Sequence, residues 1–245
     1  MRLRVVLAAT LVCAPVARAQ GMFGIPPVSY GDSSVATIMV AARGQLLTIR
    51  WLIGILRQES GPVPQPRLDS LADSLLARVL AAKVRPPTGS AARTPAGRAV
   101  QNALDNAKKA LDALGQAGES GMHGRPYART LDLLTRIHRE SPLVALRDQA
   151  LALMPAMSDG SRAVAYLEEV AGSADTTAWT AMSVLVATAN GSSGAPVSPT
   201  PAEQAAAAAA LKDLYARHAV KGGYALQLLW GWIGTNCRDA GCPAH

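Results

Sequence analysis

The chain has few aromatic residues and few charges. Aromatic residues make up 4% of its 245 residues, and Phe23 is the single phenylalanine. Ala and Leu dominate the apolar content, whereas strands favour aromatic and β-branched side chains, so an all-β sandwich is disfavoured. The composition predicts a helical protein with enough chain to bury a core, in one large domain or two small ones.

Recognisable catalytic motifs are also missing. The chain contains no nucleophile elbow, no phosphate-binding glycine loop and no dinucleotide fingerprint. None of the histidines is spaced from another ligand as metal-binding residues on a helix are: His123, His138, His218, His245. Arginines flank His138, which predicts a charged surface there rather than a poised base. We therefore expect a non-enzymatic protein without metal or cofactor, although a site assembled from distant residues stays an alternative.

The N-terminus has the pattern of an export signal. Arg2 and Arg4 precede an apolar run over 5–14, which is too short to span a bilayer. Small residues precede the expected cleavage between Ala19 and Gln20. We therefore expect the protein to be exported and to be either periplasmic or secreted.

Cleavage at this position changes the charge of the chain. The full sequence has 24 basic and 17 acidic residues and a net charge of +7. The signal contains three arginines and no acid, so its removal leaves +4. This charge falls short of the dense basic patches that nucleic-acid binding needs, so no nucleic-acid partner is expected.

Cleavage also leaves two of the three cysteines, Cys237 and Cys242. In an oxidising compartment such a pair predicts a disulfide, which here pins a C-terminal tail. A metal site with His245 as third ligand lacks a fourth ligand, and redox pairs are usually separated by two residues. Both of these are weaker alternatives.

A long apolar segment over 34–57 predicts a helix or two. Its arginines Arg43, Arg50 and Arg57 are spaced by seven and share one narrow face, which we expect to be a solvated stripe and a candidate interaction surface. A core helix is the favoured interpretation, and a membrane-interface helix is the alternative. Two interior arginines disfavour a transmembrane helix, so an integral membrane protein is not expected.

A basic stretch over 78–98 separates two further predicted helices, at 68–80 and 98–114. Between Asp73 and Asp105 there is no acid, but there are five basic residues: Arg78, Lys83, Arg85, Arg93 and Arg98. The stretch predicts a solvated Pro- and Gly-rich loop, with contact to an anionic surface such as lipid headgroups or cell-wall polymer as the alternative.

The C-terminal half contains a 33-residue repeat of helical hairpins. An amphipathic helix over 127–139, a short turn and a second helix form the first hairpin, in which Arg129, Asp132 and Arg136 share a face where they are expected to pair locally. The apolar positions recur one repeat later: Leu131, Leu134 and Ile137 fall on Val164, Leu167 and Val170, and Leu146 and Leu151 fall on Trp179 and Val184. Tandem hairpins too small to bury their own apolar faces predict a stacked α-solenoid.

The segment from Ser141 to Met154 resembles the second helix of a HEAT repeat. Leu146-Arg147 and Ala150-Leu151 match its usual pairs, whereas the second copy has Trp179-Thr180 and Ser183-Val184 instead. The resemblance covers about residues 125–190, and armadillo and tetratricopeptide hairpins share its periodicity. It implies a HEAT-like surface that binds a protein, and Arg147 is a candidate interaction residue.

A third hairpin is predicted after a Gly/Ser/Pro loop. Thr200-Pro201-Ala202-Glu203 has the pattern of a helix start, and the apolar segment 224–233 predicts a short closing helix. We expect Trp230 and Trp232 to cap the stack, whereas exposed tryptophans would mark a docking surface.

Together these patterns predict an all-α protein of eight or nine helices, in which helical hairpins stack as a short HEAT-like α-solenoid. Its predicted parts are a signal peptide (1–19), an irregular arm (20–31), an N-terminal helical portion (32–120), HEAT-like repeats with a capping helix (121–235) and a disulfide-pinned tail (236–245). The expected function is a non-catalytic scaffold or binding module of the cell envelope that engages a partner protein. Binding of an anionic polymer or a membrane interface through 34–57 and 78–98 is the alternative.

Overall fold

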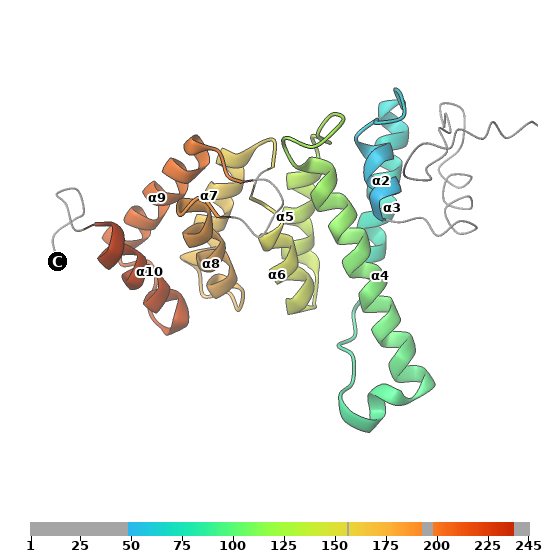
Figure 1. Cartoon of the computed structure of the whole chain (residues 1–245). Helices are drawn as coiled ribbons and strands as arrows, with labels where there is room; N and C mark the ends of the chain where they lie inside the picture. Colours follow the sequence, from blue (N-terminus) through green and yellow to red (C-terminus); the bar gives the residue numbers. More distant parts are fainter. Residues whose placement is uncertain (1–48, 156, 193–197, 238–245) are drawn as a thin grey trace, which may run out of the picture.

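Every regular element in the described part of the chain is a helix (Figure 1). The structure, a computed structural model, describes residues 49–155, 157–192 and 198–237. Nine α-helices and one 3-10 helix occur there: α2 (Ile49–Leu56), α3 (Gln65–Ala81), η1 (Gly89–Arg93), α4 (Pro95–Gly118), α5 (Thr130–Glu140), α6 (Val144–Ala152), α7 (Gly160–Ala171), α8 (Ala178–Ala189), α9 (Pro201–Ala216) and α10 (Gly223–Asn236). The all-α prediction is confirmed.

Several predicted features lie outside the described residues. These are the signal peptide with its cleavage site at Ala19 and Gln20, the arm over 20–31, Arg43 and Cys242. Cys237 directly follows α10, so the predicted Cys237–Cys242 disulfide is described on one side only and stays a prediction.

Three helical hairpins stack side by side in the C-terminal half (Figure 1). The hairpins are α5/α6, α7/α8 and α9/α10, with α6 packed on α8, α8 on α10 and α7 on α9. The helices therefore form two layers, α5–α7–α9 and α6–α8–α10. Stacked hairpins were predicted, and the start of the third is confirmed in detail: Thr200 and Glu203 form a reciprocal capping box at α9.

The 33-residue offset holds for the first helix of the hairpin and is wrong for the second. In the first helix it superimposes buried residues on buried residues: Leu131 on Val164, Leu134 on Leu167 and Ile137 on Val170. In the second helix it places the fully buried Leu146 on Trp179, which is 49% exposed. The α7–α8 turn has six residues and the α5–α6 turn three, so an offset of 35 places Leu146 on the buried Ala181 instead.

The long helix α4 joins the N-terminal helices to the stack, because it packs on α2, α3, α5 and α6. It begins at Pro95, three residues before the predicted start, where the Thr94 hydroxyl accepts the Gly97 N–H at 3.0 Å. Its inner face consists largely of Ala, Leu and Gly, so neighbouring helices approach closely. At Gly118 an added Cβ would lie 2.4 Å from the Cβ of Thr130. Glycine at this position therefore lets the start of α5 lie directly against the end of α4.

Arg57, expected on a solvated stripe, is fully buried just after α2. Its guanidinium donates five hydrogen bonds to backbone carbonyls in the last turn of α4 and in the α4–α5 connection: Gln116 (3.2 Å), Ala117 (3.1 Å), Glu119 (2.7 Å), Met122 (3.0 Å) and His123 (2.6 Å). Burial lowers the pKa of Arg57, and the nearby carboxylates of Glu59 and Glu119 oppose that shift. Arg57 therefore satisfies the open carbonyls at the end of α4, and its assignment to an interaction surface was wrong.

The described part of the apolar N-terminal segment belongs to the core. Within α2, the side chains of Trp51, Ile53, Ile55 and Leu56 are buried, and Arg50 is exposed. None of the described helices is both long and apolar enough to cross a membrane.

We expect Arg57→Met to destabilise the protein by about 3–5 kcal/mol, because it leaves several buried carbonyls without a donor. Urea unfolding followed by circular dichroism measures this change. Arg78→Met, at an exposed position in the last turn of α3, serves as the control and is expected to change stability by less than about 0.5 kcal/mol. Equal effects of the two substitutions would contradict the role of Arg57.

Candidate functional site

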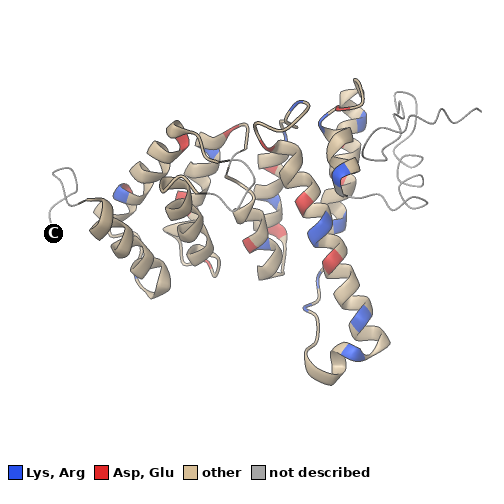
Figure 2. Ribbon diagram, viewed as in Figure 1, with Lys and Arg blue, Asp and Glu red and all other residues tan. Residues whose placement is uncertain are grey.

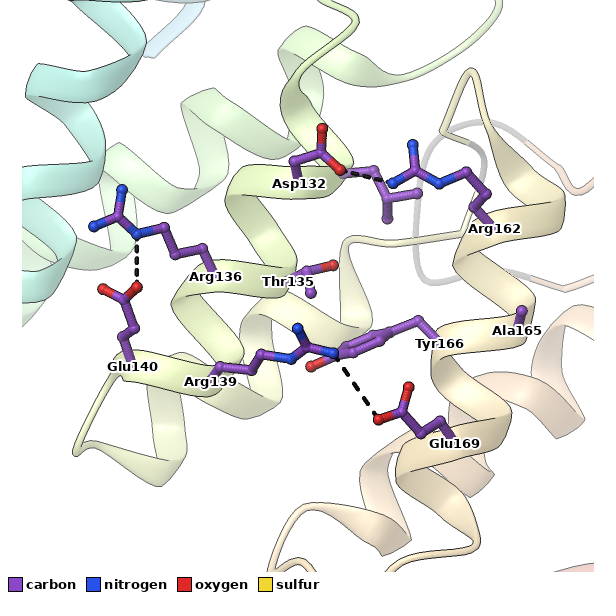
Figure 3. A pocket seen from close by; sticks show the side chains of 10 residues that line it. Asp132, Thr135, Arg136, Arg139, Glu140, Arg162, Ala165, Tyr166 and Glu169 are labelled. Carbon is purple, nitrogen blue, oxygen red and sulfur yellow. Dashed lines mark hydrogen bonds and ion pairs between the residues drawn. The ribbon is translucent and has the colours of Figure 1, made fainter.

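A groove of about 600 Å³ runs between α5 and α7 (Figure 3). The two helices make few direct contacts, whereas α6 packs on α8 behind them and α7 packs on α9. The groove is lined by Leu131, Asp132, Thr135, Arg136, Arg139 and Glu140 of α5 and by Arg162, Ala165, Tyr166 and Glu169 of α7. The first two hairpins therefore contact each other through their second helices, α6 and α8. A gap remains between their first helices, α5 and α7.

Exposed ion pairs cross or border this opening (Figure 3). Asp132 on α5 accepts a hydrogen bond from Arg162 on α7 at 2.7 Å, and Arg136 pairs with Glu140 along α5, also at 2.7 Å. The expected pairing among Arg129, Asp132 and Arg136 is wrong, because Arg129 instead lies 3.3 Å from Asp69 of α3. Exposed pairs of this kind contribute about 0–1 kcal/mol, so they can open at little cost.

Arg139 is the least constrained cation of the groove. Its guanidinium carbon lies 5.2 Å from the ring centroid of Tyr166, and its nearest carboxylate, Glu169, is 3.9 Å away. This geometry is a cation–π contact with a loose ion pair, in contrast to the short hydrogen bonds of Arg136 and Arg162. Arg139 is therefore held by the Tyr166 side chain and only loosely by the carboxylate of Glu169.

A largely buried polar network lies beside the groove and shares Tyr166 with it. The imidazole of His138 lies 2.8 Å from the Tyr166 hydroxyl through Nδ1 and 2.8 Å from the Thr177 hydroxyl through Nε2. Thr177 in turn donates to Asp175 at 2.7 Å, and Asp175 is paired with Arg147. The network thus connects α5, α6, α7 and the α7–α8 turn.

The hydrogen bonds of Thr177 decide the tautomer of His138. The single hydroxyl proton of Thr177 is used on Asp175, so the Thr177 oxygen accepts from His138 and Nε2 carries the proton. Nδ1 then accepts the proton of the Tyr166 hydroxyl. Burial, together with the positive charge of Arg147, lowers the pKa of His138, and burial raises the pKa of Tyr166.

The flanking arginines predicted a charged surface at His138, and this prediction was wrong. His138 is buried and neutral near pH 7. Both ring nitrogens are committed, and both carboxylate oxygens of Asp175 are used, one by Thr177 and one by Arg147. Both nitrogens of His138 therefore hold neighbouring side chains in place, and the network positions the helices. In the described part of the chain, no three His, Cys, Asp or Glu side chains are grouped so as to hold a metal ion.

The other predicted interaction residues separate into buried and exposed ones. Arg147 is mostly buried, and its Nε donates to the His138 carbonyl at 3.0 Å, so it belongs to the network and its assignment to an interaction surface was wrong. Trp232 is buried and its indole N–H donates to Asn190 at 3.1 Å, so it packs on the stack as a capping residue and is not part of an interaction surface. Trp230 is 59% exposed, so the expectation that it caps the stack is wrong, and the alternative of an exposed tryptophan applies to it. Arg50 is also exposed.

The basic stretch over 78–98 projects from the rest of the molecule at the α3–α4 connection (Figure 2). Its five cations, Arg78, Lys83, Arg85, Arg93 and Arg98, are exposed. None of them forms an ion pair with a residue in the described ranges. The stretch is therefore a solvated basic projection, as one of the two interpretations of the sequence predicted.

No protein-family model, no curated protein and no solved structure matches the chain. The resemblance to HEAT repeats therefore stays a prediction.

We expect stability to depend on the protonation of His138. The pKa of His138 is lower in the folded state than its ordinary value of 6.5. Neutral His138 therefore contributes fully to stability above pH 6.5, and this contribution is lost as the pH falls through the pKa of the folded state. The pKa of Asp175 is lowered to about 2, so its own contribution persists until far more acidic pH.

Urea unfolding at pH 7.5 and pH 5.0 measures this dependence in the wild type and in His138→Gln, which does not titrate. The wild type is expected to lose more free energy of unfolding between the two pH values than the variant. Groups elsewhere in the chain titrate in both proteins and cancel in the difference. Equal losses would show that His138 is not linked to folding.

Proposed function

We propose that the chain is a non-catalytic binding module that engages a protein partner through the α5–α7 groove. The observation that carries this proposal is the open, charged groove of about 600 Å³ between two hairpins that are otherwise packed together. A hollow lined by both signs of charge and one aromatic ring suits a polypeptide segment with mixed side chains.

The chemistry of the groove supports binding rather than catalysis. The ion pairs of Arg139 with Glu169 and of Arg162 with Asp132 and Asp159 are all solvent-exposed, so these side chains can exchange partners at little cost. The buried titratable group beside them is His138, and both of its ring nitrogens are hydrogen-bonded to the hydroxyls of Tyr166 and Thr177. Export to the periplasm or the exterior, expected from the N-terminal sequence, would place this module in the cell envelope.

A photo-crosslinking amino acid at Ala165, an exposed groove position on α7, tests the proposal in cells that express the full-length chain. We expect a discrete protein adduct from this position. The matched control is Ala209, an exposed alanine of α9 that does not line the groove, and no such adduct is expected there.

Charge reversal then tests whether the groove itself holds the partner. Arg139→Glu with Arg162→Glu is expected to reduce the Ala165 adduct about tenfold or more, because like charges across an interface cost several kcal/mol. Both side chains are exposed, so the circular dichroism spectrum should not change. An adduct that persists at full yield would exclude the groove as the binding site.

A second candidate function, binding to an anionic surface, is favoured by the basic projection over 78–98. Its exposed cations are not neutralised by described acids, and each basic residue near an anionic membrane contributes about 1 kcal/mol. The described part of the 34–57 segment does not add to this function, since its large apolar side chains are buried.

Flotation with liposomes that contain anionic lipid measures this activity. If the projection binds, the triple variant Arg85→Gln, Arg93→Gln, Arg98→Gln is expected to bind about 100-fold more weakly, and salt should weaken wild-type binding. The control variant Arg136→Gln, Arg139→Gln, Arg162→Gln removes the same charge from the groove and should bind like the wild type. Absence of flotation, or equal losses in both variants, would exclude the projection as a membrane contact.

A further inference from the structure

Arg139 lines two neighbouring hollows of the molecule. Figure 3 shows its side chain reaching from α5 toward Tyr166 and Glu169 of α7. These three side chains line the α5–α7 groove and also a second cavity of about 260 Å³, which we call the side cavity. The other residues that line the side cavity are His138, Arg147, Val170, Ser173 and Asp175. A ligand in the groove that contacts Arg139 therefore has room beside it for one side chain or a chain end.

The three arginines of the groove differ in how closely carboxylates hold them. Arg136 and Arg162 each donate a hydrogen bond to a carboxylate at 2.7 Å. Arg139 lies 3.9 Å from the carboxylate of Glu169, which is beyond hydrogen-bonding distance, and the two side chains are 61% and 70% exposed. Within the described ranges, Arg139 is therefore the one arginine of the groove that has no hydrogen-bonded carboxylate.

The guanidinium of Arg139 is nevertheless placed by the ring of Tyr166. Its central carbon lies 5.2 Å from the ring centroid. The ring is in turn held by the hydrogen bond of its hydroxyl to His138 at 2.8 Å, and the two rings meet edge to face at 85°. A guanidinium that already rests on a fixed aromatic ring loses less conformational freedom when it binds a ligand. The network beside the groove therefore preorganises Arg139.

We propose that Arg139 binds a carboxylate of the partner segment, which replaces Glu169. This inference rests on the proposed function, because it assumes that a polypeptide segment lies in the groove. A planar guanidinium presents paired N–H donors that match the two oxygens of a carboxylate. Glu169 is exposed and can turn to water at little cost. The acid of the side cavity, Asp175, does not compete for Arg139, because its oxygens are hydrogen-bonded to Thr177 and paired with Arg147.

The charge of the groove favours a carboxylate over a phosphate group. The groove is lined by three arginines and three acids: Arg136, Arg139, Arg162, Asp132, Glu140 and Glu169. These charges cancel, and only Arg139 lacks a close carboxylate. A phosphate group carries a charge of about −1.5 to −2 at pH 7 and is typically bound by a cluster of arginines. The single charge of an acidic side chain or of a C-terminal carboxylate matches one loosely paired guanidinium.

NMR of the arginine side-chain N–H signals in the isotope-labelled full chain tests this proposal. The probes are three short peptides with an acetylated N-terminus: one with a central Glu and an amidated end, one of glycines with a free carboxylate end, and one with a central Gln and an amidated end. We expect at least one carboxylate peptide to shift the Arg139 signal with a dissociation constant of roughly 1 mM, since a single anchor supplies only part of the affinity of an interface. The peptide that acts identifies the source of the carboxylate, and the Gln peptide should have no effect.

Arg85 on the basic projection is the internal control of this titration, because it is exposed and forms no ion pair with a described residue. Its signal is expected to respond about tenfold more weakly than that of Arg139, since no aromatic ring preorganises it. Equal responses of the two arginines, equal effects of the Glu and Gln peptides, or no shift of Arg139 would overturn the proposal.

The adduct from Ala165 provides a second measurement with a charge-conserving variant. Arg139→Lys keeps the charge but loses the paired planar donors, so it is expected to reduce the adduct about tenfold. The matched control is Arg217→Lys, at an exposed arginine directly after α9 that does not line the groove, and its adduct should equal that of the wild type. An undiminished adduct in Arg139→Lys would overturn the role of Arg139 and leave binding in the groove intact. A wild type without any adduct would instead contradict the proposed function, and the peptide titration would still decide whether Arg139 binds a carboxylate.

Discussion

The arrangement of the helices depends on one buried guanidinium. Arg57 lies where α2 ends, and its five hydrogen bonds reach carbonyls at and beyond the end of α4, about 60 residues later in the chain. Carbonyls at a helix end have no partner within the helix, and the buried side chain of Arg57 supplies donors to them. Because α4 also packs on α5 and α6, the residue that fixes its end also fixes how the stack meets the N-terminal helices.

The groove follows from the difference between two turns. The three-residue turn after α5 brings α6 back directly, whereas the six-residue turn after α7 contains Asp175 and Thr177. The Thr177 hydroxyl is hydrogen-bonded to His138 and to Asp175, and Asp175 is paired with Arg147. A polar network thus joins α5, α6 and α7 beside the groove. The longer turn also shifts the register of α8, which leaves Trp179 exposed.

The sequence contained enough information for the hairpins, because local periodicity, turn residues and the Thr200–Glu203 cap act over a few residues. Arg57 was misassigned because its acceptors lie far along the chain, and spacing by seven says only that residues share a face. Helical geometry alone would have placed Trp230 and Trp232 on different faces of the helix, since residues two apart diverge by about 200°. The same geometry would have placed His138 on a different face from its flanking arginines. The α5–α7 groove depends on a turn length in the next hairpin, which no local pattern reports.

The opening between α5 and α7 is not repeated along its layer. On one side α4 packs against α5, and on the other α7 packs against α9, so both neighbouring gaps are closed. Repeat proteins with identical units offer a row of equivalent sites and can bind a ligand several times over. Here the irregular turn gives the described stack a single groove of this kind, which sets the stoichiometry of any ligand held there at one per chain.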